Sequence, residues 1–452
     1  MVLTTGGIAL TLGSLEPTFY PFASLYCVFT EQKCYNISKE SEVNLMEIQI
    51  TIKVKLNLAN AEIASSFTNT MEQYRLACNY VSEYIFNHDF DMQQSRLNKV
   101  LYTNLRSLFM LKSQMAQSVI RTVIARYKTV KTQMKRNPYK YQDINTSEWY
   151  REIRDLTWLQ KPITFNRPQV DLQRNRDWSY LSSGQLSINT LNCRVKVNPV
   201  CHGHGFDQYF DGTWSFGLAK LLKTGGKWYL HISATKTVAD FDNQTVKHVV
   251  GIDRGLRFLA TTYDEQGQTA FFDGKIMMRK RAKYQKLRAK LQAKGTKSAK
   301  RRLKKLSGRE NRWMTDVNHR LSKTLVQKFG SNTLFVLEDL TGVSFERTDL
   351  PKALRNQNKS WAFYQLAQFL TYKAHLNNSE VIEVSAQYTS QRCPKCGTIK
   401  KSNRNHDLHE YHCSNCGYRS NDDRLGAMNI QLLGTQYISG QEQPKFELTT
   451  NA

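Results

Sequence analysis

Two cysteine pairs near the C-terminus constrain the fold of this 452-residue chain more than any other feature of its sequence. Two residues separate the cysteines within each pair, and sixteen residues separate the pairs. A two-residue gap lets two thiolates of one tight turn reach the same ion, and zinc takes four such ligands in a tetrahedron. A glycine follows each pair, where the turn needs a residue that tolerates positive φ. We therefore predict a zinc ribbon over residues 393–421 that holds one structural Zn²⁺ through Cys393, Cys396, Cys413 and Cys416.

The overall composition points to a nucleic-acid partner. The chain has 64 Lys and Arg residues against 38 Asp and Glu residues, a formal net charge of +26. An excess of this size is the electrostatic footprint of a protein that follows a phosphate backbone. The sequence has no run of about 20 uninterrupted apolar residues, so we expect no membrane-spanning helix. A thiolate cluster beside five scattered cysteines favours zinc over two disulfides, and it favours a reducing, cytoplasmic setting.

Changes of hydrophobic pattern divide the N-terminal half of the chain. Residues 1–45 show no sustained period, which predicts a disordered leader or an upstream extension. Residues 46–56 alternate apolar and polar side chains, as a half-buried strand does. Residues 60–135 then repeat apolar side chains every three or four positions, which predicts a small helical bundle. Strand-like patterning returns over residues 163–236, with a Thr-Gly-Gly turn signal at residues 224–226.

Three carboxylates stand where a nuclease core would hold metal ions. One apolar strand ends in Asp253, a second buried strand carries Glu338 near its end, and Asp423 opens an amphipathic helix. A strand-end carboxylate is usually structural, but three in this order, with a zinc ribbon before the third, are typical of a ribonuclease H-like core. Such a core holds two Mg²⁺ ions about 3.5–4 Å apart, and hard cations select carboxylate oxygens. We therefore predict that all three residues are catalytic and are Mg²⁺ ligands of a phosphodiester hydrolase.

The most basic run of the chain lies between the first two carboxylates. Residues 275–312 contain 17 Lys or Arg residues in 38 positions, and Glu310 is the single acid among them. Apolar residues at helical spacing and a break near Gly295 predict a helical hairpin. A charge run is usually a solvated face, but one so one-sided inside a nuclease domain favours contact with nucleic acid. The predicted contacts are Lys280, Arg281, Lys283, Arg288, Lys300, Arg301, Arg302, Lys304 and Arg312.

Short motifs surround these residues and resemble those of a known family. They read Gly-Ile-Asp-Arg-Gly at residues 251–255, Leu-Glu-Asp-Leu at 337–340, Thr-Ser-Gln at 389–391 and Asn-Ile at 429–430. With the four cysteines, they resemble TnpB-type proteins, transposon-encoded RNA-guided DNA endonucleases related to compact type V CRISPR effector nucleases. The resemblance covers roughly residues 46–435.

One departure from the family pattern affects the third carboxylate. The family commonly places an Asn-Ala-Ala run after this residue, whereas here Leu425 and Gly426 replace Asn-Ala. The resemblance puts Asp423 at the catalytic position, with its neighbour Asp422 as the alternative.

The resemblance implies a multidomain α+β fold. Its centre would be a ribonuclease H-like (RuvC-like) α/β nuclease core with an inserted zinc ribbon, accompanied by a β-rich wedge domain and a helical recognition domain. The implied boundaries are a leader at 1–45, the wedge at 46–58 and 136–245, the helical domain at 59–135, the nuclease at 246–392 and 422–435, the ribbon at 393–421 and a polar tail at 436–452.

The resemblance also implies an activity. A guide RNA would pair with one strand of double-stranded target DNA, and the protein would read a short flanking motif and cut at the RuvC-like site. No membrane or small-molecule substrate is expected, and the oligomeric state and the source of the guide stay open. Two alternatives remain: a nuclease-inactive RNA-guided DNA-binding repressor, which loss of an acidic residue would mark, and a transposition-associated DNA-binding protein.

Overall fold

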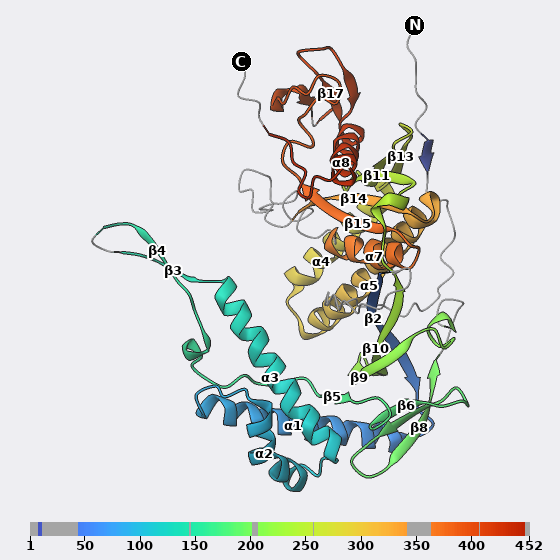
Figure 1. Cartoon of the computed structure of the whole chain (residues 1–452). Helices are drawn as coiled ribbons and strands as arrows, with labels where there is room; N and C mark the ends of the chain where they lie inside the picture. The colour runs from blue at the N-terminus through green and yellow to red at the C-terminus, as the bar shows by residue number, and fades with distance from the viewer. Residues whose placement is uncertain are drawn as a thin grey trace. The chain divides into compact units, whose positions relative to one another are not determined.

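The computed structural model describes residues 8–10 (backbone alone), 44–143, 146–200, 207–255, 257–340, 363–405 and 407–447. These residues belong to two compact units (Figure 1). We call them the N-terminal unit, residues 49–236, and the C-terminal unit, which consists of residues 237–447 together with 8–10 and 44–48. Within the described residues, no helix combines the length and the apolar character needed to cross a membrane.

Helices fill the first part of the N-terminal unit, as the periodicity predicts. They are α1 (Ala61–Asn87), α2 (Gln94–Leu108) and α3 (Ser113–Arg136). The side chain of Asn60 caps α1 by accepting a hydrogen bond from the N–H of Ile63 at 2.9 Å. The predicted apolar stripe is buried, with Phe67 and Tyr74 at most 1% exposed. These helices therefore owe their stability mainly to the packing of one apolar face.

A seven-stranded sheet completes the core of the N-terminal unit, in the order β5-β9-β10-β2-β8-β7-β6. Its central strand is β2, the strand predicted to follow the leader. The alternate side chains of β2 are buried. Gly225 and Gly226, both at positive φ, join β9 to β10 in a tight hairpin, which confirms the predicted turn. The strands are β2 (Leu45–Asn57), β5 (Gln169–Leu172), β6 (Trp178–Tyr180), β7 (Leu186–Asn189), β8 (Arg194–Val200), β9 (Ser215–Thr224) and β10 (Lys227–Ala239).

A six-stranded sheet forms the centre of the C-terminal unit, in the order β1-β13-β12-β11-β14-β15. The strand β12 (Phe258–Tyr263) runs antiparallel to both of its neighbours, β11 (His248–Asp253) and β13 (Thr269–Asp273). The strands β14 (Thr333–Asp339) and β15 (Glu380–Ser385) run parallel to β11. At the other edge, β1 (Ile8–Leu10) pairs in parallel with β13. Residues 8–10 of the segment predicted as a disordered leader or an upstream extension thus form a strand, and residues 1–7 and 11–43 lie outside the described part.

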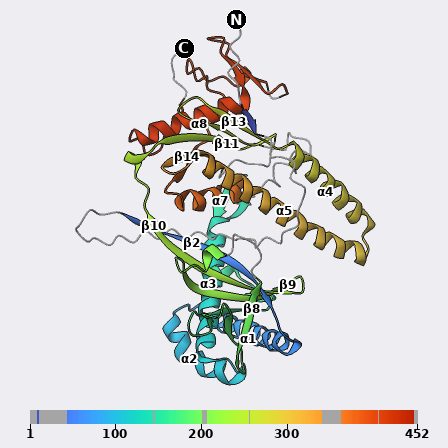
Figure 2. The same cartoon turned by 90° about the vertical axis from the view of Figure 1, so that its right-hand side faces the viewer.

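Helices cover both faces of this sheet (Figure 2). Phe335 and Leu337 of β14 pack with α5 (Lys297–Phe329) and α7 (Phe363–His375). The alternating Leu334 and Val336 pack with α8 (Asp422–Ile438) on the opposite face. Successive side chains of a strand point to opposite faces, so a strand covered on both sides must be apolar throughout, and residues 333–337 are all buried.

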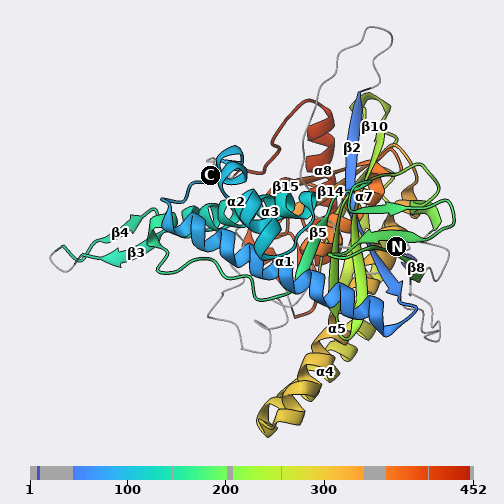
Figure 3. The same cartoon turned by 90° about the horizontal axis from the view of Figure 1, so that it is seen from below.

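The basic run forms the predicted helical hairpin of α4 (Lys275–Lys294) and α5, which extends beyond the strands of the C-terminal unit (Figure 3). Gly295 ends α4 in the left-handed conformation, and Thr296 caps α5 by accepting from the N–H of Ala299. A small apolar seam that includes Leu291 and Leu306 holds the two helices together.

The described part of the segment predicted as a polar tail, residues 436–447, packs on the C-terminal unit. Helix α8 continues to Ile438, and Phe446 is 6% exposed in the cluster on the α8 face of the sheet. The guanidinium of Arg392 lies 4.7 Å from the centre of the Phe446 ring. The composition of residues 436–447 is polar, but one aromatic side chain is enough to anchor them.

Candidate active site

The four predicted zinc ligands come together in one cluster. The Sγ atoms of Cys393 and Cys416 lie 3.5 Å apart, and those of Cys396 and Cys413 lie 3.6 Å apart. All four ligand atoms lie within 4.8 Å of one another. Disulfide sulfurs would be about 2.05 Å apart, whereas Zn–S bonds of about 2.3 Å in a tetrahedron place sulfurs about 3.8 Å apart. The cluster therefore fits a tetrahedral thiolate site rather than two disulfides.

Matching turns build the two halves of this cluster. The N–H of Gly397 donates to the carbonyl of Cys393 at 2.9 Å, and the N–H of Gly417 donates to the carbonyl of Cys413 at 3.0 Å. Both glycines have φ near +70°, at +76° and +70°. The short strands β16 (Arg404–Asn405), β17 (Glu410–His412) and β18 (Arg419–Asn421) join the turns and lead directly into α8.

Two of the three predicted catalytic carboxylates lie at neighbouring strand ends. Asp253 is the last residue of β11, and Glu338 lies near the end of β14. These strands are parallel, with Ile252 beside Leu337, so the carboxylates follow their strands at the same edge of the sheet. Asp423 comes from the first turn of α8, which packs across β11.

Glycines let α8 approach β11 closely enough to bring Asp423 to this edge. A Cβ atom on Gly251 would lie 2.2 Å from the carbonyl oxygen of Ala427, so no larger residue fits between strand and helix. One turn after Asp423, a Cβ atom on Gly426 would lie 3.0 Å from the Oδ2 atom of Asp253. The carboxylate of Asp253 therefore faces the first turn of α8. It lies next to Gly426, the glycine that replaces alanine in the family pattern.

The pKa values of all three carboxylates are raised. Burial raises the pKa of Asp253 well above its usual value, and the charges of Glu338 and Asp423 raise it further. Burial also raises the pKa of Glu338, although the hydroxyl of Thr389 donates a hydrogen bond to this carboxylate and opposes the shift. Burial, followed by the charge of Asp422, raises the pKa of Asp423. Such a cluster needs protons or cations to offset its charge.

The ligand atoms of these three residues do not all lie within 4.8 Å of one another, unlike the cysteine sulfurs. Two ions about 3.5–4 Å apart spread their ligands more widely than a single ion does. Carboxylate oxygens are the ligands that Mg²⁺ prefers. The half-buried acidic edge therefore has the type of ligand that suits hard cations.

The adjacent aspartates of α8 have different surroundings. Asp422 is 1% exposed, and its Oδ2 atom lies 3.0 Å from the guanidinium of Arg404. Its Oδ1 atom lies 3.4 Å from Nδ1 of His409. Among the described residues, the carboxylate of Asp423 has no hydrogen-bond or ion-pair partner. Oxygens of Asp422 and Asp423 and a nitrogen of His409 could also surround an ion, but Arg404 already neutralises Asp422.

Arg404 is a residue of this site that sequence reasoning missed. It lies on the zinc ribbon, and its charge lowers the pKa of each of the three predicted catalytic carboxylates. Nothing in the local sequence around position 404 marks this contact, because it arises only when the ribbon folds against α8. A search of the ribbon sequence for Lys and Arg residues that precede Asp423 would have included Arg404 among its candidates.

The α4–α5 hairpin exposes most of the predicted nucleic-acid contacts. Arg281 is the exception: it is 6% exposed, and its guanidinium is attracted by the charge of Glu310. Arg288 also forms an ion pair with Glu310. The single acid of the run thus draws two arginines toward the seam between the helices, so Arg281 is not a surface residue. The exposed residues are Lys280, Lys283, Lys300, Arg301, Arg302, Lys304 and Arg312.

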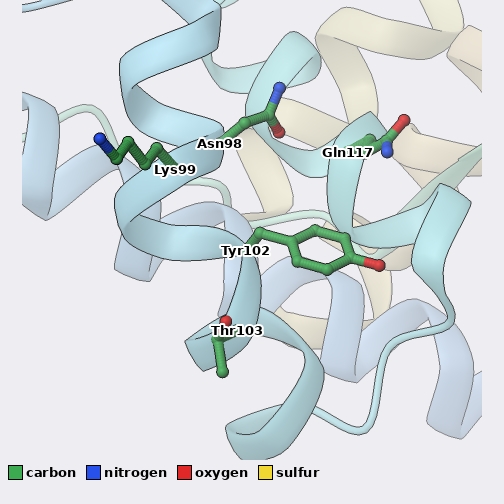
Figure 4. Close-up of a pocket in the computed structure, with 5 residues that line it drawn as sticks. All are labelled: Asn98, Lys99, Tyr102, Thr103 and Gln117. Atoms are coloured by element: carbon green, nitrogen blue, oxygen red, sulfur yellow. The ribbon is translucent and has the colours of Figure 1, made fainter.

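A hollow in the N-terminal unit offers no catalytic chemistry. It is lined by side chains of α2 and α3, namely Asn98, Lys99, Tyr102, Thr103 and Gln117 (Figure 4). These side chains include no carboxylate, thiol or imidazole. The hollow therefore lacks the carboxylate, thiol and imidazole ligands of a metal site.

Two family models match the chain. The model described as a probable transposase matches residues 235–342, and the model described as a Cas12f1-like TNB domain matches residues 363–430. The first match includes Asp253 and Glu338, and the second includes Asp423 and all four ribbon cysteines.

Individual relatives agree with these models. The CRISPR-associated endodeoxyribonuclease Cas12f1 of Sulfoacidibacillus thermotolerans is 26% identical over 301 residues, which are 60% of this chain and 68% of the relative. A TnpB-like protein of Acanthamoeba polyphaga mimivirus is 28% identical over 198 residues, which are 42% of this chain and 38% of the relative. A solved structure of CasPhi-2 (Cas12j) bound to crRNA aligns with 88% of this chain and 99% of that chain, at 12% identity and a TM-score of 0.44. That structural likeness is too distant to support a conclusion.

The matches show that the chain is similar both to TnpB-like proteins and to Cas12f1. Residues 235–342 resemble the probable-transposase model, and residues 363–430 resemble the Cas12f1-like TNB domain.

Proposed function

We propose that this protein is an RNA-guided DNA endonuclease. It would bind a guide RNA, recognise a short flanking motif in double-stranded target DNA, and cleave the DNA at a RuvC-like site. The single observation that carries the proposal is the convergence of three half-buried carboxylates, those of Asp253, Glu338 and Asp423, at the ends of β11 and β14 and the start of α8. Burial raises the pKa of each of them. The names of the relatives, a CRISPR-associated endodeoxyribonuclease and TnpB-like proteins, support the same activity.

The strand order supports a RuvC-like nuclease core. Three antiparallel strands followed by two parallel ones, in the spatial order β13-β12-β11-β14-β15, make the sheet typical of ribonuclease H-like proteins. The first carboxylate lies on the central strand β11, the second on its parallel neighbour, and the third on the helix that packs across both. Along the chain, we propose that the wedge, helical, nuclease and ribbon domains follow the boundaries expected above.

The chain's own residues would hold and orient the metal ions. When bound, two Mg²⁺ ions supply an activated water and neutralise charge on the scissile phosphate. Asp253 and Glu338 would contribute oxygens from rigid strand ends, and Asp423 would contribute one from α8. Thr389 fixes the orientation of Glu338 through its hydrogen bond. The four cysteines would hold a Zn²⁺ ion that keeps the ribbon folded and Arg404 beside Asp422.

The exposed cations of the α4–α5 hairpin would follow a nucleic-acid backbone. Seven of the nine predicted contacts are exposed there, and none of the seven has an ion pair within 4.0 Å among the described residues. Glu310 is engaged with Arg288, and Asp316 is engaged with Arg320, although its charge also acts on Lys280. Contacts of this kind fix the position of a duplex and carry no sequence information, which suits a protein whose guide supplies the specificity.

Isosteric substitutions test the proposal. With the RNA that co-purifies with the protein, Asp253→Asn and Glu338→Gln should abolish Mg²⁺-dependent cutting of matched DNA and leave RNA and DNA binding largely intact. Asp273→Asn is the matched control, because this carboxylate ends β13 of the same sheet and only accepts the N–H of Lys275. Wild-type cutting in both site variants would exclude the acidic edge as the active site. RNA-dependent binding by wild-type protein that never cuts DNA would favour the repressor alternative.

A further inference from the structure

A two-stranded hairpin of the N-terminal unit is exposed on both faces. Its strands are β3 (Tyr139–Gln142) and β4 (Trp149–Glu152), and all eight residues are exposed. The hairpin follows α3 directly and extends past the end of that helix (Figure 1). An isolated two-stranded hairpin is only marginally stable in water, and aromatic side chains usually seek burial. Four aromatic residues on an uncovered hairpin therefore require an explanation.

One face of the hairpin supports itself. The rings of Tyr141 and Tyr150 are stacked with centroids 5.8 Å apart, and those of Tyr139 and Tyr141 are stacked at 5.9 Å. Tyr139 also packs against Trp158, at 5.6 Å. The stacking forms a continuous aromatic ladder that ties the hairpin to the turn at Leu156–Trp158. This ladder explains why the hairpin persists, but it leaves the opposite face unused.

The opposite face combines two opposed cations with a free indole. Lys140 pairs directly across from Arg151, so their side chains share a face, and Trp149 lies two positions before Arg151 on that face. Like charges directly opposite each other are destabilising in a strand pair. Among the described residues, neither cation has an acidic partner within 4.0 Å, and Trp149, at 70% exposure, contacts no other ring. A hollow beside strand β4 is lined by these three residues together with Tyr150 of the ladder.

Both features of this face match the chemistry of an unpaired nucleotide. An anion between Lys140 and Arg151 would remove their mutual repulsion, and phosphate is the anion that two converging cations bind well. An exposed indole offers a platform on which a nucleobase can stack, whatever its identity. An acidic peptide would satisfy the cations and leave the indole bare, whereas the bases of a duplex are already stacked on one another.

We propose that this face of the β3–β4 hairpin binds an unpaired segment of the guide RNA, with a phosphate between Lys140 and Arg151 and a base stacked on Trp149. The assignment rests on the proposed function, because that function supplies the RNA. RNA is recognised mainly through unpaired loops and ends whose bases stack on aromatic side chains. In the proposed reaction the target DNA strand is paired with the guide, which leaves the displaced DNA strand as the competing source of unpaired bases.

Direct binding to an unstructured oligouridine tests the surface without requiring cleavage. Trp149→Ala in the full chain should weaken binding about tenfold, as expected for the loss of one stacked base, and Trp149→Phe should retain most of the affinity. Lys140→Glu should also weaken binding, and it should reduce the slope of log Kd against log salt by about 0.7 for each phosphate that the variant no longer neutralises. Lys161→Glu, an exposed residue of the same unit off the hairpin, is the control and should leave the slope unchanged.

The outcomes separate this proposal from the proposed function. Unchanged oligouridine affinity in a folded Trp149→Ala protein overturns the RNA surface, even if the protein cuts DNA. A larger loss for oligothymidine than for oligouridine assigns the face to the displaced DNA strand and overturns the RNA assignment as well. Binding of oligouridine does not require the carboxylates of the proposed active site, so Asp253→Asn should bind oligouridine like wild-type protein. Failure of the wild-type protein to cut DNA would therefore count against the proposed nuclease activity and not against the RNA surface. Circular dichroism and the Tm of each variant establish that it is folded.

Discussion

Gly426→Ala should damage the active site while leaving the fold intact. Gly426 lies inside α8, so alanine favours the helix by up to about 1 kcal/mol and would raise Tm by about 2–4 °C if nothing opposed it. The new Cβ atom would lie 3.0 Å from Oδ2 and 3.2 Å from Cγ of Asp253. Ordinary contacts of this kind are about 3.4–4 Å, so the carboxylate must move by a few tenths of an ångström.

A shift of this size is small for stability and large for catalysis. Metal-binding groups need placement within about 0.5 Å, and a displacement of about 1 Å can reduce a rate about a hundredfold. We therefore expect the cutting rate to fall about tenfold at low Mg²⁺, with partial recovery at high Mg²⁺. Gly308→Ala in α5 is the matched control, because its Cβ atom would meet only the flexible end of Arg312 at 3.4 Å.

Single-turnover cleavage across a Mg²⁺ titration, together with the Tm of each protein, decides the outcome. Wild-type cutting by Gly426→Ala at every Mg²⁺ concentration would refute the inference that Asp253 faces α8 in the working site. A Tm lowered by many degrees would show instead that the helix itself is displaced. Gly308→Ala should gain stability and cut normally.

Three further predictions concern the ribbon, the paired aspartates and a buried histidine. Wild-type protein should contain about one zinc per chain, and Cys413→Ser should lose it and cut DNA more slowly; zinc retention by that variant, measured by metal analysis, would contradict the site. Asp423→Ala should abolish cutting at unchanged Tm, whereas Asp422→Ala should lower stability by about 3 kcal/mol in denaturant unfolding, because Arg404 loses its buried partner. The opposite pattern would exchange the roles of the two aspartates. Burial lowers the pKa of His319 to about 3. Below about pH 6.5 the unfolded chain therefore binds a proton at this histidine that the folded chain excludes. The free energy of unfolding consequently falls as the pH drops from about 6.5 toward 3. His319→Phe should flatten the dependence of Tm on pH in that window, and an unchanged profile would show that His319 is not buried as a neutral ring.

Local patterns predicted the elements that carry the proposed chemistry. Cysteine spacing is set by how two sulfurs of one turn reach one ion, so the gathering of four sulfurs could be read from positions 393–416. Carboxylates at strand ends become neighbours whenever the strands are parallel and adjacent, which is the case for Asp253 and Glu338. Helical and strand periods likewise predicted the helices α1 to α3 and the strand β2, because each follows from the burial of one face.

Contacts between distant segments could not be predicted in this way. The ion pair of Arg404 with Asp422 depends on how the ribbon folds back on α8, and no spacing rule encodes it. The neighbours of Arg281 are basic, which predicts a surface cation, yet Glu310 on the second helix draws it inward. Phe446 stands in a polar stretch, where a single buried ring leaves no period to detect.

The position of α8 has a consequence for the timing of synthesis. Asp253 and Asp423 lie 170 positions apart in the chain, and α8 also covers one apolar face of the sheet. A ribosome that adds about 5–20 residues per second needs roughly 10 to 30 seconds to pass from one to the other. During that interval the nascent chain has an uncovered sheet and an incomplete acidic edge. A truncated product that ends before α8 would therefore be prone to aggregation, and it would lack the third carboxylate of the proposed site.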